Sequence, residues 1–435
     1  MTNSPQLRRL LFWTLDFVKG RPIKRHINNI KFLNENYDSE IACEKRNENI
    51  ARLITHVTST TPFYKNLNVK KLTDFPVINK NIVRENFEGF KSVKYLYKKC
   101  EEVVTSGSTG TPFRLLHNID KRNRHRADNI YFAQKGGYDL GDKVYLLRAA
   151  HNTDTKSMVE FRKKNIIPHG VMNYTDAEMK KLFEKIKDDK NKKCIVCFAS
   201  MAKIIGNYLD QNDIEPLKTK IKSVITDGDS LSNEDKDKLE KFFQIPVFAR
   251  YGNMECGILG QQNERTNYGY SLNWASYHYE ILSLNKDEPA KKGELGRIVI
   301  TDLFNYSMPL IRYDTGDMAI LGEPEQEGQP PYLERIEGRL VDLIYNSKGE
   351  LLSPYMVATK MLPYLELKQF QFAQTAPKTY EFRLNPWTSF TKEEQLITES
   401  KGYLGKDAIV SIKYVDDIPL LSSGKRRQVV NEMNL

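Results

Sequence analysis

Residues 103–112 (VVTSGSTGTP) place a run of small and hydroxylated residues directly after an apolar pair. Gly107 and Gly110 allow the backbone of this stretch to turn and to approach a ligand closely. The hydroxyl and backbone N–H groups of such a loop suit a phosphate, because they offer many donors without side-chain bulk. The spacing differs from the common nucleotide-binding loop, which ends in Gly-Lys-Ser/Thr. Taken alone, the stretch fits a solvated turn slightly better than a phosphate site.

Two further loops combine acidic residues with glycine, at 227–230 (DGDS) and 251–257 (YGNMECG). Each loop lies at the end of an apolar stretch that predicts a strand, at 221–226 and 246–250. With another strand predicted at 194–199 and helices predicted between them, this pattern indicates a parallel sheet with crossover helices. Ligands of such sheets bind at the carboxyl ends of the strands. We therefore expect both loops at one ligand-binding edge.

The rest of the chain predicts a mixed architecture. Helices are expected at 39–58, 118–135 and 179–186, a strand at 143–148, and antiparallel strands at 277–282 and 296–301. Residues 309–317 are expected to end a strand in a tight acidic turn. Beyond residue 338, strands near 370, 380 and 409 and helices near Met356 and Lys392 indicate a small α+β unit. The predicted fold is α/β and α+β, with a large N-terminal domain (1–338) containing parallel α/β sheets and an antiparallel β subdomain, and a small C-terminal domain (339–435).

Composition narrows the functional class. No run of about 18 apolar residues exists, so no membrane span is expected. Five cysteines, an odd number scattered through 435 residues, fit a reducing cytoplasm. The net charge of +10 comes without any zinc-finger, RNA-recognition or helix-turn-helix signature, so a nucleic-acid partner is not expected.

The first 35 residues carry seven basic and only two acidic side chains, next to Leu, Phe and Trp. This composition leaves two interpretations open. The segment could lie on an anionic membrane surface, peripheral to the inner face of the membrane. The favoured alternative is a packed N-terminal helix with a solvated basic face.

Other reactive side chains offer weaker signals. Cys194 and Cys197 are three residues apart on a predicted strand, so they point to opposite faces and are expected to be buried rather than to share a metal. Cys256 follows Glu255 directly, but no base for a nucleophilic role is evident. His125 is expected to be exposed, and His151 fits either the border of a pocket or a solvated position.

Five motifs together resemble the adenylate-forming superfamily of acyl-CoA synthetases, adenylation domains and luciferase. They occur in the family's order at 105–112 (TSGSTGTP), 251–255 (YGNME), 312–317 (RYDTGD), 338–342 (GRLVD) and 423–425 (SGK). Within that superfamily the chain is most similar to the phenylacetate–CoA ligase family, in its capsular polysaccharide biosynthesis branch. The similarity runs from about residue 40 to 430.

The resemblance implies a role for each motif. The loop of Ser106, Gly107, Ser108, Thr109, Gly110 and Thr111 would hold the β- and γ-phosphates of ATP. Asp227, Gly228 and Asp229 would lie near the adenine and the acyl pocket. Tyr251, with Gly252 and Asn253 beside it, would stack on the purine, and Glu255 would help to hold Mg²⁺, which prefers carboxylate and phosphate oxygens.

The resemblance assigns the later motifs to the ribose and to catalysis. Asp317 would clamp the ribose hydroxyls, supported by Arg339. Lys425 would bridge the acyl carboxylate and the α-phosphate as charge develops. A plain turn at 314–317 and a basic tail at 423–427 are disfavoured by the ordered set, whereas the roles of Arg339 and Asp229 stay open.

The implied reaction joins a small carboxylic acid to AMP with release of pyrophosphate, and then transfers the acyl group to coenzyme A. Three alternatives stay open: an amine, sugar or carrier-protein acceptor; a degenerate nucleotide-binding regulator; and a basic membrane-surface adaptor. The small C-terminal domain would rotate about a hinge at Val341–Asp342. The sequence departs from many relatives at Thr111, where they carry a lysine, and at Val341, where they carry an acidic residue. The acid is not indicated, and a homodimer is left open.

Overall fold

The computed structural model describes most of the chain. The described residues are 4–105, 113–148, 155–170, 176–212, 214–228, 231–324, 326–339, 344–352, 357, 360, 361, 363, 364, 366–419 and 427–433. The predicted phosphate loop from Ser106, the residues Asp229 and Lys425, and the predicted hinge at 341–342 lie outside these ranges.

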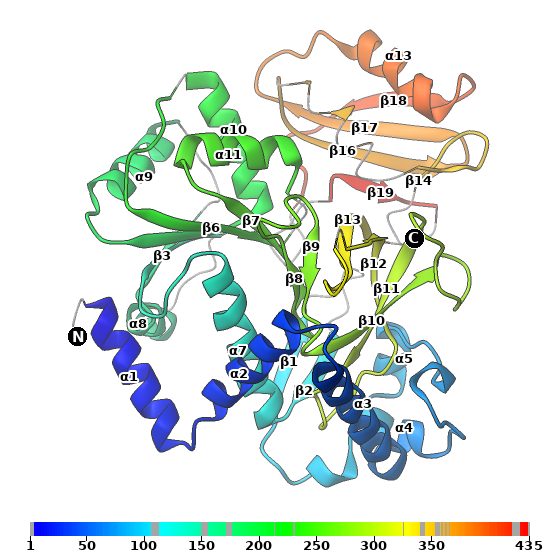
Figure 1. Ribbon diagram of the computed structural model, residues 1–435. Helices are drawn as coiled ribbons and strands as arrows, with labels where there is room; N and C mark the ends of the chain where they lie inside the picture. Colours follow the sequence, from blue (N-terminus) through cyan, green and yellow to red (C-terminus); the bar gives the residue numbers. More distant parts are fainter. Residues whose placement is uncertain are drawn as a thin grey trace.

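An eleven-stranded sheet runs through the large part of the molecule, in the order β10-β11-β12-β13-β9-β8-β7-β6-β5-β3-β4 (Figure 1). Its parallel half consists of β3 (Lys143–Arg148), β4 (Ile166–Gly170), β5 (Lys193–Phe198), β6 (Ile221–Asp227) and β7 (Val247–Asn253). The strands expected at 143–148, 194–199, 221–226 and 246–250 are confirmed, and so is their parallel pairing. The strand β4 was not predicted.

The antiparallel half continues the same sheet from β7 onward. Its strands are β8 (Gly257–Gln261), β9 (Tyr270–Leu272), β10 (Tyr277–Ser283), β11 (Leu295–Asp302), β12 (Tyr313–Gly322) and β13 (Tyr332–Arg339). The expectation that 309–317 ends a strand is wrong, because β12 begins at Tyr313 and continues through the acidic motif. Gly316 has a φ of +79°, which allows a local irregularity without ending the strand.

Helices cover both faces of the parallel half. Figure 1 shows α9 (Asp176–Asp188), α10 (Ala199–Asn212) and α11 (Asn233–Phe243) on one side, and α7 (Ile119–Lys135) and α8 (Thr155–Lys163) on the other. The Ser232 Oγ atom accepts a hydrogen bond from the Asp235 N–H at 3.0 Å and so caps the start of α11. Met179, Leu182 and Ile186 of α9 are buried in the main hydrophobic core, as their helical spacing predicted.

The N-terminal segment is helical. It contains α1 (Pro5–Val18), α2 (Pro22–Glu35), α3 (Glu40–Thr60), α4 (Pro62–Lys65), α5 (Lys80–Glu85) and α6 (Phe87–Phe90), with short 3-10 turns at Leu72–Asp74 and Val93–Tyr95. The predicted helix 39–58 is α3, capped by Ser39. The residues after α6 enter the hairpin of β1 (Glu101–Thr105) and β2 (Phe113–His117). Thr105 and Phe113 are paired across this hairpin, so they fix both ends of the predicted phosphate loop.

The C-terminal residues build a separate core. Strands β16 (Leu367–Ala376), β17 (Thr379–Pro386), β18 (Ile409–Tyr414) and β19 (Val429–Asn431) form a sheet in the order β18-β17-β16-β19, next to α13 (Glu393–Leu404) and the short pair β14 (Ile344–Tyr345) and β15 (Leu351–Leu352). The helix expected near Lys392 is confirmed as α13, and the one near Met356 falls mostly outside the described residues.

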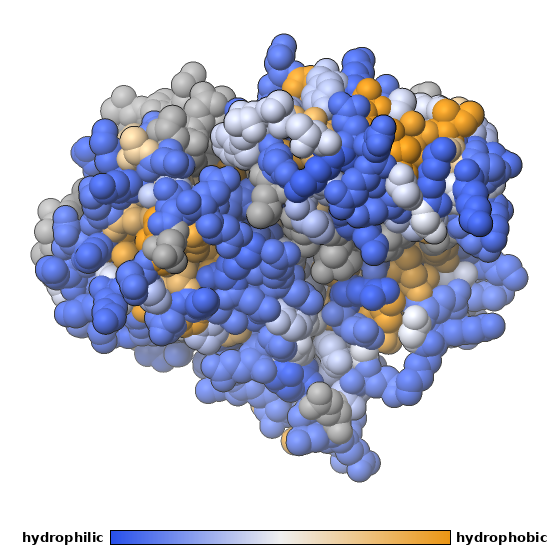
Figure 2. Space-filling model, turned by 90° about the horizontal axis from the view of Figure 1, so that it is seen from above, coloured by the Kyte–Doolittle hydropathy of each residue, from blue (hydrophilic) through white to orange (hydrophobic). Residues whose placement is uncertain are grey.

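This C-terminal unit lies against α10 and α11 (Figure 1), where the Lys203 ammonium sits 5.1 Å from the centroid of the Phe370 ring. Seen from above, the surface is largely hydrophilic and its hydrophobic residues gather in separate patches (Figure 2). The large sheet has its own extensive hydrophobic core, distinct from that of the C-terminal unit. The division between residues 338 and 339 stays a prediction.

Candidate functional site

Two tyrosine–carboxylate hydrogen bonds cross between the 251–255 and 312–317 motifs. The Tyr251 hydroxyl donates to Asp317 Oδ2 at 2.9 Å, and the Tyr313 hydroxyl donates to Glu255 Oε1 at 2.9 Å. Each motif therefore contributes one tyrosine and one carboxylate to a reciprocal pair. Burial raises the pKa of both tyrosines well above its ordinary value, and the adjacent carboxylate acts in the same direction. Both hydroxyls stay protonated and can donate.

Lys80 is a third partner of this site. Its ammonium lies 2.8 Å from Glu255 Oε1, with 26% of the lysine side chain exposed and 2% of the glutamate side chain exposed. Lys80 is the first residue of α5, which Asn79 caps by accepting from two backbone N–H groups. The ammonium also lies 5.7 Å from the centroid of the Phe113 ring. Because Phe113 is the first residue after the 106–112 loop, the Lys80 charge lies close to the end of that loop.

The turn between β7 and β8 presents the Glu255 carboxylate. Asn253 Oδ1 accepts from the Cys256 N–H at 2.8 Å, which closes the turn. A Cβ atom at Gly252 would lie 2.4 Å from the Gly257 carbonyl oxygen, so only glycine fits there. Gly257 itself has a φ of +105°. These constraints explain why a glycine-rich sequence surrounds a single buried carboxylate.

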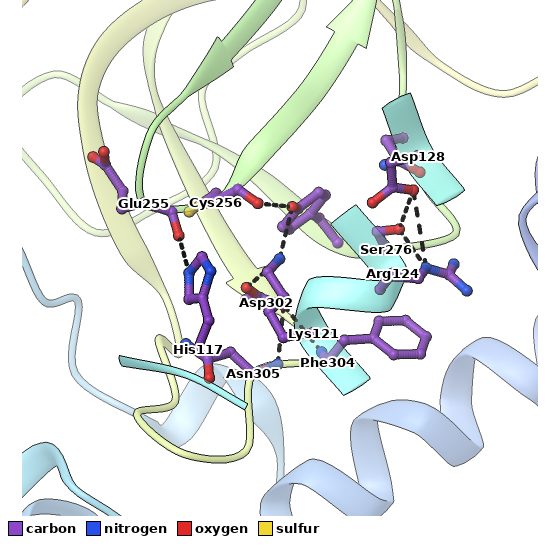
Figure 3. A network of polar contacts seen from close by, with 12 residues as sticks. His117, Lys121, Arg124, Asp128, Glu255, Cys256, Ser276, Asp302, Phe304 and Asn305 are labelled. Atoms are coloured by element: carbon purple, nitrogen blue, oxygen red, sulfur yellow. Dashed lines mark hydrogen bonds and ion pairs between the residues drawn. The ribbon is translucent and has the colours of Figure 1, made fainter. Parts of the chain in front are cut away.

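Two side chains donate hydrogen bonds to carbonyl oxygens of this turn. His117 Nε2 donates to the Glu255 carbonyl oxygen at 2.8 Å, and the Tyr277 hydroxyl donates to the Cys256 carbonyl oxygen. Figure 3 shows the Glu255 carboxylate directed away from these contacts, so the backbone is held without using the carboxylate oxygens. His117 ends β2, and its bond therefore joins the hairpin of the predicted phosphate loop to the Glu255 turn.

A buried charged network supports Tyr277 (Figure 3). The Lys121 ammonium donates to the Tyr277 hydroxyl at 2.9 Å and pairs with Asp302 at 2.6 Å, and neither charged side chain is exposed. Farther along α7, Arg124 donates to the Ser276 Oγ atom at 2.7 Å, and that hydroxyl donates to an Asp128 carboxylate oxygen at 2.8 Å. The predicted helix 118–135 is correct.

The inward orientation of these charges was not predicted from the sequence. Their spacing of three and four residues along α7, at Lys121, Arg124 and Asp128, was the available signal for a buried polar face. Because each buried charge has a partner, the face can pack against the sheet without an unpaired ion.

The two acidic residues of the 312–317 motif make different contacts. Asp314 pairs with Arg297 at 2.8 Å and accepts from the Gly316 N–H, so it stabilises the strand. Asp317 faces Tyr251 instead, and its backbone position is opposite Arg339 in the β12–β13 register. The pairing of Asp317 with Arg339 across these two strands agrees with a shared site.

Asp227 and Gly228 lie where β6 ends, next to β7 in the parallel sheet. They share the carboxyl edge of the sheet with 251–253, as predicted. Gly228 has a φ of +93°, which suits glycine at the turn away from the strand.

Three minor predictions are also resolved. His125 is not exposed: its ring packs against Gly257, where a Cβ atom would lie 3.0 Å from His125 Cδ2, and burial lowers its pKa to about 4. Cys194 and Cys197 are buried in β5 as expected. Burial raises the pKa of the Cys256 thiol well above its usual value, which disfavours a nucleophilic thiolate.

Two named proteins are similar to this chain in sequence. A Staphylococcus aureus protein named protein CapK is 23% identical over 446 aligned residues, which cover 96% of this chain and 94% of the relative. A phenylacetate–coenzyme A ligase from Pseudomonas putida is 23% identical, over 69% of this chain and 68% of the enzyme.

Solved structures share the fold. A 2-hydroxyisobutyryl-CoA ligase in the postadenylation state superposes with a TM-score of 0.67 at 17% identity, over 90% of both chains. An O-succinylbenzoate coenzyme A synthetase from Bacillus subtilis, in complex with AMP, superposes with a TM-score of 0.53 at 17% identity, over 75% of this chain and 67% of that one.

In fold and in its ordered motifs the chain is similar to adenylate-forming enzymes of the acid–CoA ligase type, as the sequence resemblance indicated. Within that class, residues 344–432 match the family model described as the CapK C-terminal domain. That match covers the C-terminal unit from its first buried residue, Ile344, to the end of β19.

Proposed function

We propose that the protein activates a small carboxylic acid with ATP and then transfers the acyl group, with coenzyme A as the expected acceptor. In the first step a carboxylate oxygen bonds to the α-phosphorus of ATP, and the bond from that phosphorus to the bridging oxygen breaks, releasing pyrophosphate. In the second step the acceptor thiol forms a thioester, AMP leaves, and the thiol proton passes to solvent. The reciprocal Tyr251–Asp317 and Tyr313–Glu255 pairs carry this proposal, because they bring two separate motifs into one polar site.

The donor set at Glu255 fits Mg²⁺. Within the described ranges, no three His, Cys, Asp or Glu side chains are grouped so that they could hold a metal ion. Mg²⁺ bound with a nucleotide commonly uses one or two carboxylates together with phosphate oxygens, so a single protein carboxylate is sufficient. Glu255 would hold the ion, which when bound neutralises phosphate charge. The hydrogen bond from Tyr313 keeps the carboxylate oriented.

Lys80 provides a positive charge beside the predicted phosphate loop. The resemblance to the superfamily implies a lysine in many members at the position of Thr111, and the loop of this chain lacks that charge. The Lys80 ammonium is near Phe113, the residue that leaves the loop, and its salt bridge to Glu255 holds it there. We assign Lys80 to binding of the triphosphate. It was not among the residues selected from sequence.

Asp317 would accept hydrogen bonds from the ribose hydroxyls, and the hydrogen bond from the Tyr251 hydroxyl would orient its carboxylate. Lys425 is assigned to the transition state of the first step from the motif alone. A positively charged donor near the α-phosphate and the acyl carboxylate stabilises charge that develops only in that transition state.

The proposed setting is capsule or envelope polysaccharide synthesis. Its support is the similarity to protein CapK over nearly the whole chain and the CapK C-terminal domain match.

ATP–pyrophosphate exchange tests the first step without coenzyme A. The assay uses a panel of aryl, alkyl, amino and sugar acids, and exchange with one class is the expected result. Adding coenzyme A, an amine or a carrier protein to the active acid then identifies the acceptor by thioester or amide formation. Tight ATP binding by calorimetry without exchange for any acid would favour the nucleotide-binding regulator instead.

A further inference from the structure

The outward face of α1 is apolar rather than basic. Five large side chains on this helix are between 53% and 76% exposed: Leu10, Leu11, Leu15, Phe17 and Val18. At 100° per residue they fall within one half of the helix circumference. The expected packed helix is present, but the side that faces solvent is the hydrophobic one. Isolated exposed leucines are common, whereas five together on one 14-residue helix form a patch.

The opposite side of α1 is fixed to the protein. The buried Asp16 carboxylate accepts from the Ile23 and Lys24 N–H groups, both at 3.0 Å, and so begins α2. Arg8 donates to the Lys163 carbonyl oxygen at 2.8 Å at the end of α8. Phe12 and Trp13 pack on the core formed by α2 and α7. Because these contacts use the inward side, the apolar side cannot turn inward without breaking them.

Cations lie at the C-terminal end of the apolar face. Lys19, Arg21 and Lys24 are exposed just beyond the helix end. The Arg21 guanidinium lies 4.7 Å from the centroid of the Phe17 ring, and the Lys24 ammonium lies 5.2 Å from that of Trp13. Long cationic side chains beside aromatic rings are the arrangement found where a protein surface meets lipid headgroups.

We propose that α1 binds the surface of an anionic phospholipid bilayer, with its five apolar side chains inserted at the acyl boundary and the neighbouring cations on lipid phosphates. Figure 1 shows α1 at the edge of the molecule, so a flat surface can reach it. No described helix is long and apolar enough to cross a bilayer, so the contact is a peripheral one. A second copy of the chain is a poorer occupant, because a two-fold contact would bring the same cations together.

Sedimentation with lipid vesicles tests the proposal. Wild-type protein is mixed with phosphatidylcholine vesicles, with or without phosphatidylglycerol. We expect binding that requires phosphatidylglycerol. It should weaken when salt is raised from roughly 0.1 to 0.5 M, because salt screens the attraction between the cations and the lipid phosphates. Binding that ignores lipid charge, or no binding, would overturn the proposal.

Variants distinguish vesicle binding through the apolar face of α1 from nonspecific adsorption of exposed apolar side chains. Leu10→Ser with Leu15→Ser should lower the partition coefficient by about tenfold or more, because two inserted side chains are lost. Tyr97→Ser with Ile409→Ser is the matched control, since both side chains are highly exposed but lie elsewhere. Equal loss in both pairs would contradict a role for α1.

Light scattering tests whether α1 instead binds a second copy of the chain. If the protein is a dimer that the α1 pair converts to monomers, while vesicle binding is unchanged, α1 is a self-association surface and the proposal fails. Lys19→Gln with Arg21→Gln should weaken binding to anionic vesicles alone. None of these readouts depends on adenylation, so they stand apart from the proposed reaction.

Discussion

The Lys80 ammonium lies 2.8 Å from Glu255 Oε1, although the two residues are far apart in sequence. The contact joins the first turn of α5 to the turn between β7 and β8. The same oxygen accepts from Tyr313, so one carboxylate is shared by a cation and a hydroxyl. Charge-assisted contacts of this kind are stronger than neutral ones and fix geometry. This pair makes α5 part of the proposed ATP site.

Replacing Lys80 should weaken ATP binding more than it slows chemistry. Lys80→Ala removes the positive charge near the loop that lacks a lysine at Thr111, so we expect KM for ATP to rise by roughly 10–100-fold, the scale of one charged hydrogen bond. Steady-state ATP–pyrophosphate exchange measures this. Lys91→Ala is a matched control, because Lys91 pairs with Glu88 on the neighbouring helix. Equal effects from both variants would contradict the assignment.

Removing each tyrosine hydroxyl should affect a different ligand, Mg²⁺ in one case and the ribose of ATP in the other. Tyr313→Phe removes a donor to Glu255, so we expect a higher Mg²⁺ concentration for half-maximal exchange and little change in the preference for ATP over its 3′-deoxy analogue. Tyr251→Phe releases Asp317 and should reduce that preference, with little effect on Mg²⁺. Losing one such hydrogen bond should change the relevant constant by roughly 3–10-fold. Identical profiles for the two variants would show that the pairs only support the fold.

Lys425→Ala should cut acyl-adenylate formation by roughly 10²–10³-fold or more, the scale for losing one preorganised donor. The transfer of a supplied acyl-adenylate to the acceptor should be spared much more, because that step does not use charge on the α-phosphate in the same way. Single-turnover assays of each half-reaction measure the difference. Normal pyrophosphate release in the variant would mean that another residue has this role.

Much of the fold was predictable because its signals are local. Apolar stretches such as 194–199, alternating with helical stretches, predict parallel strands without further information, and Ser39 and Ser232 mark helix starts by side-chain chemistry. The edge that carries the 227 and 251 loops follows from the parallel topology alone. The course of 309–317 was not predictable in this way, because Gly316 and two aspartates suggest a turn whether or not neighbouring strands continue the pairing.

The site was only partly predictable, since its residues depend on distant contacts. Glu255 and Asp317 stand out as carboxylates within ordered motifs. Lys80 and His117 do not, because one lysine among many and one histidine at a strand end carry no local signal of their partners. The exposed apolar side of α1 was missed for a related reason: composition showed the cations, but only the packing of Asp16 and Trp13 decides which side faces solvent.

His117 should make stability depend on pH in a defined window. Burial lowers its pKa to about 4, from an ordinary value near 6.5, so the unfolded chain binds more protons between these limits. Stability is therefore highest above pH 6.5 and falls as the pH is lowered toward 4, by roughly 3 kcal/mol from this group. Urea unfolding of wild type and His117→Gln, at about pH 7.5 and at about pH 5, measures the difference.

Gln can still donate to the Glu255 carbonyl oxygen, but it does not titrate. We therefore expect His117→Gln to keep ATP–pyrophosphate exchange near the wild-type rate at neutral pH, while losing less stability at acid pH. His117→Ala removes the donor as well and should lower exchange even at neutral pH, because the Glu255 turn is no longer tied to β2. Equal exchange rates for the alanine and glutamine variants would limit His117 to packing, and an unchanged acid sensitivity in His117→Gln would assign the pH dependence to other buried groups such as His125.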